Sequence, residues 1–536
     1  MSVSTAQLTP LRFLERSAAV FGEQCAIVHG ARRLSYAEFA AHATRLAQAL
    51  RAAGIEPGDR VAYLCPNVPE LLIAHFAVPL AGAALVAINT RLAPEEVRYI
   101  CDHSGARLLV VDAELAEIVA PVADALESVE EIITITDDQA PARGSAALAG
   151  RGYDELLDAG SDEPLPWTVA DELETITINY TSGTTGQPKG VMYSHRGAYL
   201  NALGEVIHSE HALSSVYLWT LPMFHCNGWC TTWALTAIGG RHVCLRAVRG
   251  DEIWRLLDDQ GVTHLNGAPT VLTAIVNADE AHPLDRTLTV TTAGAAPSPT
   301  TIAQMEALGA RIVHVYGLTE TYGPYSVCEW QPGWEQLQTE ARATLLARQG
   351  VGMIQAQRLR VVDQEMVDVP ADGETMGEIV MQGNNVMTGY FDDPGATDEA
   401  FRGGWFHSGD LGVMHPDGYV QLLDRAKDVV VSGGENISTV EVEQALVSHE
   451  SVLEAAVIGV PDDRWGERPK GFVVLKSGRD ASESELVEHV RGRIARYKSP
   501  DAIEFVAELP KTSTGKVQKY ELREREWAGH EARIKG

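Results

Sequence analysis

Between residues 60 and 115, apolar and polar positions follow the pattern of strands that alternate with helices. Short apolar runs predict strands at 61–64, 84–88 and 108–111, and residues 68–80 predict a helix after the first of them. Residues 94–103 separate the last two strands. Because this alternation is typical of βαβ units, we expect an α/β fold with a parallel sheet covered by helices.

Three expected helix starts fit the pattern of a capping box, in which a Ser and a Glu three residues later bind each other's backbone N–H groups. The pairs are Ser35 with Glu38, Ser438 with Glu441, and Ser482 with Glu485. Residues 139–170 are rich in Ala, Gly, Asp and Pro, and we expect them to form a surface connection.

After about residue 425 the predicted elements become shorter. Apolar runs predict strands at 429–431, 455–460 and 471–475, with one capped helix that ends near Val447 and another that ends near Arg496. This pattern predicts a small α+β domain of about a hundred residues at the end of the chain.

Composition narrows the class of protein. A formal net charge of -30 on 536 residues argues against nucleic-acid binding and against attachment to anionic lipid. The N-terminus lacks the pattern of a secretory signal, and no apolar run approaches the ~20 residues of a transmembrane helix. Seven cysteines, an odd number, do not make a disulfide framework. We therefore expect a reduced, cytoplasmic protein. Cys226 and Cys230 lie four apart beside His225, but no second ligand pair accompanies them, so no structural zinc is expected.

The run Tyr180–Gly190, with the sequence YTSGTTGQPKG, concentrates hydroxyls, glycines and one cation after an apparent strand. Glycines at 183, 186 and 190 let backbone N–H groups approach phosphate oxygens, and Lys189 adds a positive charge. The P-loop pattern fails, because Lys189 follows a proline and precedes a glycine. A Gly-Thr-Thr-Gly turn alone would be a solvated loop, whereas the full run indicates a polyphosphate site of another kind.

Four further segments carry candidate chemistry, although each alone is a weak signal. Tyr316 and Glu320, in the segment 315–321, offer a ring to stack on a purine and a carboxylate for a hard cation such as Mg²⁺. The others are a small-residue turn at 292–297, the segments 405–412 and 424–428 with Asp410 and Arg425, and the loop 509–517 with Lys516. A carboxylate at Asp410 suits ribose hydroxyls, and Arg425 suits phosphate or ribose.

Together these segments resemble, in order and position, the motifs of the adenylate-forming superfamily, which includes acyl-CoA synthetases, peptide-synthetase adenylation domains and luciferases. The resemblance covers residues 174–520. It implies a large N-terminal domain of layered α/β sheets with a β-barrel-like part, residues 1–426, and a smaller mobile C-terminal α+β domain, residues 427–536, with the hinge at Lys427. It also implies ATP, Mg²⁺ and coenzyme A as cofactors.

The resemblance assigns roles residue by residue. The catalytic set is Lys516, Glu320, Lys189, Thr181 and His225, with Glu320 and Thr181 at the metal. The nucleotide and CoA set is Thr181, Ser182, Gly183, Thr184, Thr185, Lys189, Gly294, Ala295, Ala296, Val315, Tyr316, Gly317, Leu318, Thr319, Asp410, Arg425, Gly433 and Gly434. The acyl pocket set is His225, Trp229, Asn266, Gly267, Tyr322 and Gly323.

The acyl segment 221–230, LPMFHCNGWC, contains no acidic residue that could pair with the ammonium of an amino acid. It resembles the corresponding segment of short-chain, medium-chain and aromatic acyl-CoA ligases. Trp229 either caps the pocket, favouring a short, branched or cyclic acid, or is ordinary core. The expected partners are therefore a carboxylic acid and CoA, and dimers among relatives make a homodimer a further expectation.

In this interpretation a carboxylate is activated to acyl-AMP with release of pyrophosphate, and the acyl group is then transferred to CoA. We expect the small domain to rotate about Lys427 between these steps, so that Gly433 and Gly434 replace Lys516 at the site. Alternatives are a stand-alone acyl-AMP ligase, an enzyme that delivers to a carrier protein, a luciferase-like oxidation and a non-catalytic nucleotide-binding protein.

Overall fold

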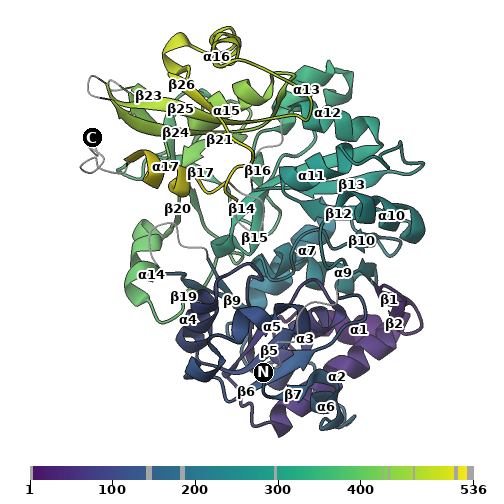
Figure 1. The fold of residues 1–536 in the computed structure, drawn as a ribbon. Coiled ribbons are helices and arrows are strands. Elements are labelled where there is room, and N and C mark those ends of the chain that lie inside the picture. Colours follow the sequence, from purple (N-terminus) through teal and green to yellow (C-terminus); the bar gives the residue numbers. More distant parts are fainter. Residues whose placement is uncertain are drawn as a thin grey trace.

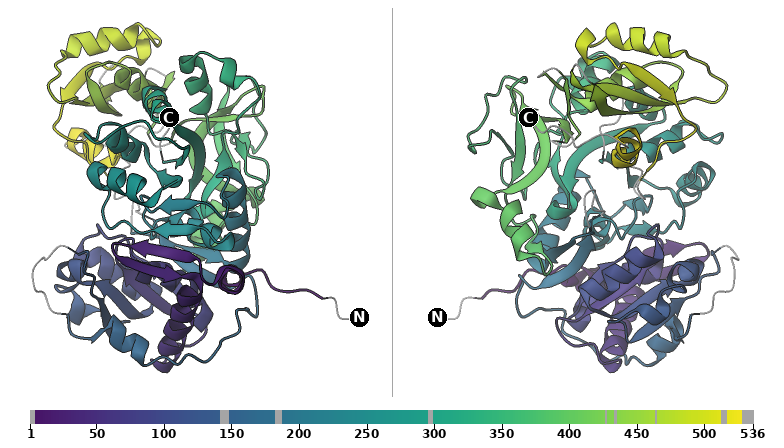
Figure 2. Two further views of the ribbon diagram at one scale, coloured as in Figure 1. Left: turned by 90° about the vertical axis from the view of Figure 1, so that its right-hand side faces the viewer. Right: turned by 60° about the vertical axis from the view of Figure 1, so that its left-hand side comes forward.

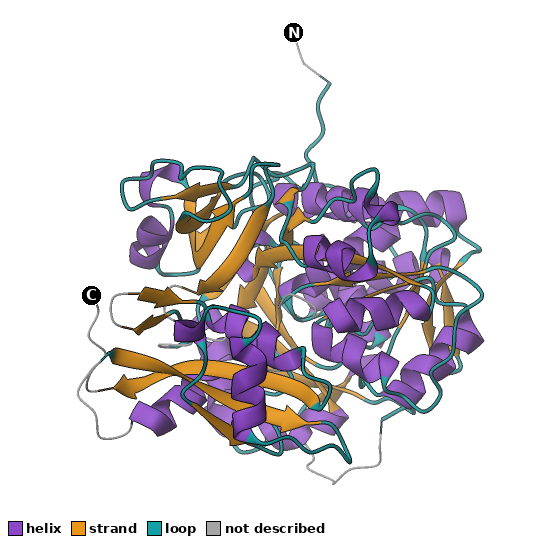
Figure 3. Ribbon diagram, turned by 90° about the horizontal axis from the view of Figure 1, so that it is seen from above, coloured by secondary structure: helices purple, strands orange, loops and turns teal. Residues whose placement is uncertain are grey.

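The computed structural model describes residues 4–140, 148–181, 187–294, 299–425, 428–432, 435–462, 465–511 and 517–527. Four sheets organise these residues (Figure 1). The sheet formed by the last hundred residues lies at the opposite end of the molecule from the first 160, and the N-terminal segment projects from the body (Figures 1, 2 and 3). Among the described residues, no helix is both long and apolar enough to cross a bilayer.

An eight-stranded sheet has the order β19-β9-β8-β4-β3-β5-β6-β7. Its strands are β3 Arg60–Leu64, β4 Ala84–Ala87, β5 Ala106–Asp112, β6 Glu131–Ile135, β7 Arg151–Gly152, β8 Thr175–Tyr180, β9 Gly190–Ser194 and β19 Gly389–Tyr390. Strand β3 pairs in parallel with β4 and β5. The helix α3, Pro69–Ala81, packs with Val61 and Tyr63 on one face, and α4, Pro94–Ser104, packs with Ala62 and Leu64 on the other. The predicted βαβ arrangement is confirmed.

A nine-stranded sheet has the order β16-β15-β14-β13-β12-β10-β11-β1-β2. Its strands are β1 Cys25–His29, β2 Arg32–Ser35, β10 Val216–Leu218, β11 Arg241–Val243, β12 His264–Gly267, β13 Leu288–Thr292, β14 Ala310–Leu318, β15 Gly323–Val327 and β16 Val351–Gly352. The associated helices are α1 Leu11–Phe21, α2 Tyr36–Ala52, α7 His195–His208, α8 Cys226–Trp229, α9 Thr231–Ala237, α10 Gly250–Gln260, α11 Pro269–Val276, α12 Pro299–Ala307 and α13 Thr339–Leu346. Apolar side chains such as Leu265 and Val290 meet α10, α11 and α12 on one face. The parallel strands β12, β13 and β14 all end toward the candidate site.

Where a β-barrel-like part was expected, the described residues form an open antiparallel sheet, β17-β18-β20-β21. Its strands are β17 Arg360–Val362, β18 Met376–Met381, β20 Phe406–Met414 and β21 Val420–Arg425, and α14, Pro394–Ala400, precedes β20. An isolated bridge from Gly350 to Val420 links it to the neighbouring sheet. Four strands are too few to enclose an interior of side chains, so no barrel closes among the described residues.

The C-terminal sheet has the order β23-β22-β25-β24, with β26 beside β25. The elements are β22 Val430–Ser432, β23 Glu435–Ile437, α15 Thr439–Val447, β24 Val452–Asp462, β25 Gly466–Leu475, α16 Glu483–Arg491, β26 Ala502–Phe505 and α17 Lys519–Trp527. Leu446, Val457, Val473 and Leu486 belong to a core of its own. The predicted α+β character is confirmed, but α16 ends at Arg491 rather than near 496, where a separate single turn, Arg496–Lys498, follows.

The three predicted caps differ in how complete they are. Ser35 Oγ accepts from the Glu38 N–H at 3.2 Å, and the Glu38 carboxylate accepts from the Ser35 N–H at 2.7 Å, which completes the box. Ser438 accepts from the Glu441 N–H, but the Glu441 carboxylate binds Lys498 at 2.6 Å instead. The third cap, before α16, likewise shows only the Ser bond.

The expectation of a surface connection over residues 139–170 was wrong in part. Residues 151–158 form β7 and the helix α6, Tyr153–Asp158. Tyr153 and Leu156 are buried against the first core. Two apolar residues in so short a segment are enough to anchor a helical turn, yet too few to produce a periodic pattern in the sequence. A short helix α5, Ala116–Val119, lies earlier in the chain.

Candidate active site

The signature run lies between two antiparallel strands, β8 and β9. Thr181 and Lys189 close its base: the Thr181 N–H donates to the Lys189 carbonyl at 3.0 Å, and the Lys189 N–H donates to Thr181 Oγ1 at 3.4 Å. The predicted cradle residues Ser182, Gly183, Thr184 and Thr185 lie outside the described residues. The Lys189 ammonium stands 4.8 Å from the centre of the Tyr390 ring, a cation–π contact.

Glu320 lies in the short turn 319–321 that follows β14. The Tyr390 hydroxyl donates to Glu320 Oε1 at 2.9 Å. Burial raises the pKa of Glu320, and the bond from Tyr390 opposes that rise by favouring the carboxylate. Lys189, Tyr390 and Glu320 therefore form one chain of contacts that joins the signature run to the second predicted motif.

Tyr316, Asp410 and Arg425 meet on three strands, β14, β20 and β21. Tyr316 is buried and its hydroxyl donates to Asp410 Oδ2 at 2.7 Å. Arg425 is the cross-strand partner of Asp410, with Nε 3.4 Å from Oδ1. Burial, and then the neighbouring Asp410 charge, raise the pKa of Tyr316 well above its ordinary value. The structure thus brings together residues that the sequence offered as separate motifs.

The remaining residues of the second motif shape the main chain of the site. A Cβ added at Gly317 would lie 1.8 Å from the Gly323 carbonyl oxygen, so only glycine permits this approach of β14 to β15. Val315 is buried, whereas Leu318 and Thr319 are partly exposed. Tyr193 donates to the Thr319 carbonyl at 2.6 Å and so ties the turn to β9.

The acyl segment contains a left-handed turn. Cys226, Asn227, Gly228, Trp229 and Cys230 all have φ between 44° and 61°, which non-glycine residues rarely adopt in succession. The turn places Trp229, which is 5 % exposed, against Gly323, where an added Cβ would lie 2.8 Å from Trp229 Cδ1. The contact between the acyl segment and the second motif therefore requires glycine at 323.

His225 stands at the start of this turn and is partly exposed. Its Nε2 is 3.7 Å from Cys226 Sγ, which in turn lies 3.5 Å from Thr319 Oγ1. All seven cysteines have free thiols, and six are buried. Cys226 thus links His225 to the turn that carries Glu320.

The other predicted pocket residues contribute in different ways. Asn266 ends β12 with Gly267, and its amide donates to Thr231 Oγ1 at 3.1 Å. The Tyr322 hydroxyl is bound by the Ser194 N–H at 2.7 Å, and its ring stacks on that of Tyr193. Because this side chain packs against β9, Tyr322 shapes the site through its main chain, which has a φ of 62° and leads into Gly323.

Gly294 follows β13 with a φ of 92° and is exposed, as expected for a turn that a flat ring could approach. Ala295, Ala296, Lys427, Gly433, Gly434 and Lys516 lie outside the described residues. Near Lys516 the chain is anchored on both sides: Lys511 bridges to Val517 in the backbone, and the Lys519 ammonium is buried 2.7 Å from Glu443 Oε1.

Tyr390 was not foreseen from the sequence. It lies in a two-residue strand, β19, which is too short for a recognisable alternation, and it is brought to Glu320 by pairing with β9. Three further side chains that hold the acyl segment, Asn67, His75 and Asn227, were also missed as functional residues. Their contacts join residues about 50 to 160 positions apart in the sequence, so no local pattern predicts them.

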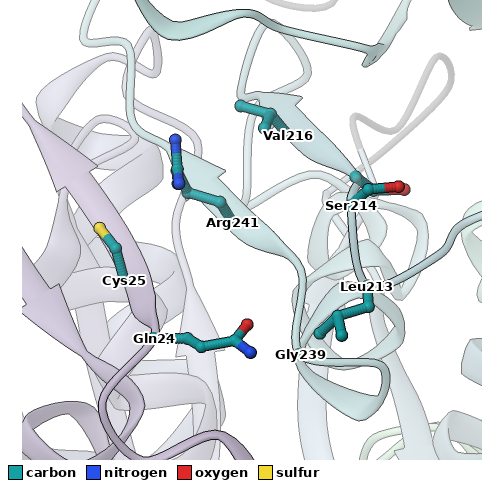
Figure 4. A pocket seen from close by; sticks show the side chains of 8 residues that line it. Gln24, Cys25, Leu213, Ser214, Val216, Gly239 and Arg241 are labelled. Carbon is teal, nitrogen blue, oxygen red and sulfur yellow. The ribbon is translucent and has the colours of Figure 1, made fainter.

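A surface pocket lies elsewhere, among Gln24, Cys25, Leu213, Val216 and Arg241 (Figure 4). It is at the amino ends of β1, β10 and β11, whereas the candidate site is at the carboxyl ends of β12, β13 and β14. Ligands of open α/β sheets bind at the carboxyl ends of the strands. The pocket is therefore remote from the candidate chemistry.

Comparison with known proteins agrees with the superfamily resemblance of the sequence motifs. The chain matches the AMP-binding enzyme family over residues 14–391 and the AMP-binding enzyme C-terminal domain over residues 441–516. It is 44% identical to the peroxisomal acetate/butyrate–CoA ligase of Arabidopsis thaliana, over 96% of this chain and 94% of that protein. It is 42% identical to 4-hydroxybutyrate–CoA ligase 2 of Metallosphaera sedula, with the same coverage.

The fold resembles the crystal structure of the anthranilate–CoA ligase AuaEII in complex with anthranoyl-AMP, with a TM-score of 0.86 and 26% identity over 97% of this chain and 98% of that one. The layered α/β sheets and the separate C-terminal sheet place the fold in the class of adenylate-forming enzymes. The chain belongs to the AMP-binding enzyme family.

Proposed function

We propose that the protein is an acyl-CoA synthetase, which converts a carboxylic acid to acyl-AMP with ATP and then transfers the acyl group to CoA. The observation that carries the proposal is the convergence of Tyr316, Asp410 and Arg425 beside the group of Lys189, Tyr390 and Glu320. Relatives at 40–44% identity that are named CoA ligases support it.

In the first half-reaction, Asp410 would accept hydrogen bonds from the ribose hydroxyls, and the main chain near Gly294 would border the adenine. A carboxylate oxygen of the acid attacks the α-phosphorus, and the bond from that phosphorus to the bridging oxygen breaks, so that pyrophosphate leaves. Lys189, with Lys516 from the C-terminal segment, would offset the repulsion between the two anions. Preorganised charges of this kind are worth ~10²–10³ in rate each.

The donor set at Glu320 fits a magnesium ion. The two donors that the resemblance assigns to the metal, the Glu320 carboxylate and the Thr181 hydroxyl, are both oxygens, and Mg²⁺ prefers one or two carboxylates together with substrate phosphates. Among the described residues, no group of three or more His, Cys, Asp or Glu side chains forms a site independent of nucleotide. Bound there, the ion would neutralise phosphate charge.

In the second half-reaction, the thiol of CoA attacks the acyl carbonyl, AMP departs with the oxygen that came from the acid, and the thiol proton passes to solvent. The free acid alone would not react, because its leaving group would be an oxide ion. We propose that the C-terminal domain, from Lys427 onward, rotates to bring Gly433 and Gly434 to the site for this step, and that Lys516 withdraws.

The acyl pocket is proposed to lie between His225, Trp229 and Gly323 on one side and Asn266 and Gly267 on the other. The buried indole of Trp229 against Gly323 supports a shallow pocket for a short, branched or cyclic acid. Replacement by Ala would remove the ring and extend the space available to an acyl chain.

The test is a panel of short, long, branched and aromatic acids, each incubated with ATP, Mg²⁺ and CoA and analysed by mass spectrometry. Formation of AMP, pyrophosphate and one acyl-CoA thioester supports the proposal. AMP and pyrophosphate without thioester, even with CoA in excess, would instead indicate delivery to a carrier protein. No AMP with any acid would contradict it.

We also propose a cytoplasmic location, supported by seven free thiols. The names of four relatives place those proteins in the peroxisome, so imaging of a tagged chain tests the compartment. The homodimer that the resemblance implies stays a prediction, which sedimentation velocity tests.

A further inference from the structure

The acyl segment depends on contacts made far away in the sequence. We call residues 219–230 the wall segment, because they carry His225 and Trp229 along one side of the proposed acyl pocket. The wall segment is held by side chains that lie just before and within the helix α3 of the eight-stranded sheet. These side chains are Asn67 and His75.

Asn67 holds the beginning of the wall segment. Its amide Nδ2 donates to the carbonyls of Trp219 and Leu221 at 2.8 and 3.0 Å, and its Oδ1 accepts from the Met223 N–H at 2.7 Å. The side chain is 6 % exposed. One buried amide therefore satisfies three main-chain groups of an irregular segment that has no sheet partner for them.

Asn227 holds the left-handed turn. Its Oδ1 accepts from Thr177 Oγ1 and from Asn179 Nδ2, both at 2.7 Å, and its Nδ2 donates to His75 Nε2 at 3.0 Å. His75 Nδ1 donates to the Leu71 carbonyl at 2.7 Å, which leaves Nε2 as the acceptor. Both polar atoms of the Asn227 side chain thus have buried partners on β8 or α3.

This network offsets an unfavourable backbone. A left-handed conformation disfavours each non-glycine residue by about 1–2 kcal/mol, and four of the five residues at 226–230 are not glycine. Such strain persists only when the surroundings determine the conformation. If the turn relaxed, the direction of the chain after Asn227 would change, and Trp229 would leave Gly323.

We propose that Asn227, His75 and Asn67 are positioning residues that set the acyl selectivity, because they hold Trp229 against Gly323 from the neighbouring sheet. The proposal rests on the acyl pocket proposed above. It assigns control over which acid is used to α3 and to Asn67 just before it, which hold the wall segment from the eight-stranded sheet. None of the three side chains takes part in the chemistry.

The experiment compares variants of the full-length enzyme over straight-chain acids of two to eight carbons, with KM and kcat for each acid and for ATP. In Asn227→Ala and His75→Leu, KM for the preferred acid should rise about 10- to 100-fold, and the preference should move toward longer chains. KM for ATP should stay within about twofold of the wild-type value, because the variants leave Tyr316, Asp410 and Arg425 unchanged.

His75→Gln is the conservative variant, since its amide oxygen can still accept from Asn227, and it should retain the wild-type profile. Ser128→Ala is the stability control: Ser128 is partly buried and donates to the Cys101 and Ala106 carbonyls, on the opposite face of the eight-stranded sheet from α3. It should lower the melting temperature without a change in acid preference. If Asn227→Ala fails to fold, the positioning role is tested by His75→Leu and His75→Gln alone: a shifted acid profile in the first and a wild-type profile in the second support it, and equal profiles contradict it.

Trp229→Ala separates the two proposals. If it shifts the acid profile while folded Asn227→Ala and His75→Leu keep the wild-type profile, the positioning role is overturned and the acyl pocket stands. If Trp229→Ala also leaves the profile unchanged, the acyl pocket itself is wrongly assigned, and the positioning role falls with it.

Discussion

The Tyr390 hydroxyl donates a 2.9 Å hydrogen bond to Glu320 Oε1, although 70 positions separate the two residues. The bond orients a carboxylate that burial would otherwise drive toward its protonated form, because burial raises the pKa of Glu320. The Lys189 ammonium also lies over the Tyr390 ring. The Tyr390 side chain therefore links the signature run at 180–190 to the motif at 315–321.

Tyr390→Phe removes this donor and leaves the ring in place. Hydrogen bonds to charged groups contribute about 1.5–3 kcal/mol, so ATP–pyrophosphate exchange should fall roughly 10- to 100-fold. The pKa of Glu320 should rise further, which moves the acid limb of the pH–rate profile to higher pH. Tyr419→Phe, whose hydroxyl binds the Glu329 carbonyl outside the site, is the control. Wild-type exchange and an unmoved profile in Tyr390→Phe would contradict this role.

Asp410→Asn tests the ribose contact. The wild-type enzyme should prefer ATP to 3′-deoxy-ATP, because a carboxylate accepts from the ribose hydroxyls more strongly than an amide does. In Asp410→Asn the preference for ATP over 3′-deoxy-ATP should shrink about tenfold. Tyr316→Phe removes the 2.7 Å bond to Asp410 and should reduce the same preference by a smaller factor. Equal discrimination in wild type and Asp410→Asn would show that the ribose lies elsewhere.

Much of the fold was predictable because it is local. Short apolar segments in residues 61–111 predict the βαβ units that the structure shows. All three capping serines also cap helices in the structure. Tyr316, Glu320 and Asp410 could be found because their segments, each weak alone, together resemble the motifs of the adenylate-forming superfamily. The pattern of apolar and polar positions does not predict their proximity, since it follows from the pairing of β20 with β21 and from the packing of β14 beside them.

Asn67 and His75, which support the acyl segment, could not be predicted, because their role depends on contacts between distant parts of the sequence. His75 lies in a buried helix whose only other charged or polar residue is Glu70, and Asn67 stands two residues before that helix begins. In the sequence each is one polar residue in an apolar stretch. Only the tertiary contact with the left-handed turn gives them a role, and that turn is itself invisible to periodicity because it has neither the period of a strand nor that of a right-handed helix.

Glu205 predicts a pH dependence of stability. It is 1 % exposed on α7, and burial raises its pKa to about 8. Between about pH 5 and 8 the unfolded chain has lost a proton that the folded protein keeps, so this group lowers the free energy of unfolding by about 1.4 kcal/mol for each unit of rising pH.

Glu205→Gln should abolish that contribution. Urea unfolding at pH 6, 7 and 8 should show a variant that gains stability relative to wild type as pH rises, with the difference levelling off above pH 8. The Ser209 hydroxyl, which binds Glu205 Oε2 at 3.1 Å, remains to pair with the amide oxygen. Parallel stability curves for the two proteins would contradict the assignment.

Lys519 is predicted to hold the C-terminal sheet together. Its ammonium is buried beside Glu443, with the charges of Asp424 and Asp428 nearby. Lys519→Met leaves the buried Glu443 carboxylate without its counter-ion, which costs about 3–5 kcal/mol. Hydrogen exchange over residues 435–462 should accelerate accordingly. Lys511→Met breaks a more exposed pair with Glu454 and should cost only about 0–1 kcal/mol. Equal acceleration in the two variants would count against the role of Lys519.

The central claim is that an acid is activated as its adenylate before thioester formation. The most direct measurement uses an acid labelled with ¹⁸O in both carboxylate oxygens, with ATP and CoA, and determines the masses of the phosphate-containing products. The account predicts one ¹⁸O atom in AMP and none in pyrophosphate, because the attacking oxygen stays on the α-phosphorus when the thiol displaces AMP. Label in inorganic phosphate, or AMP without label, would contradict it.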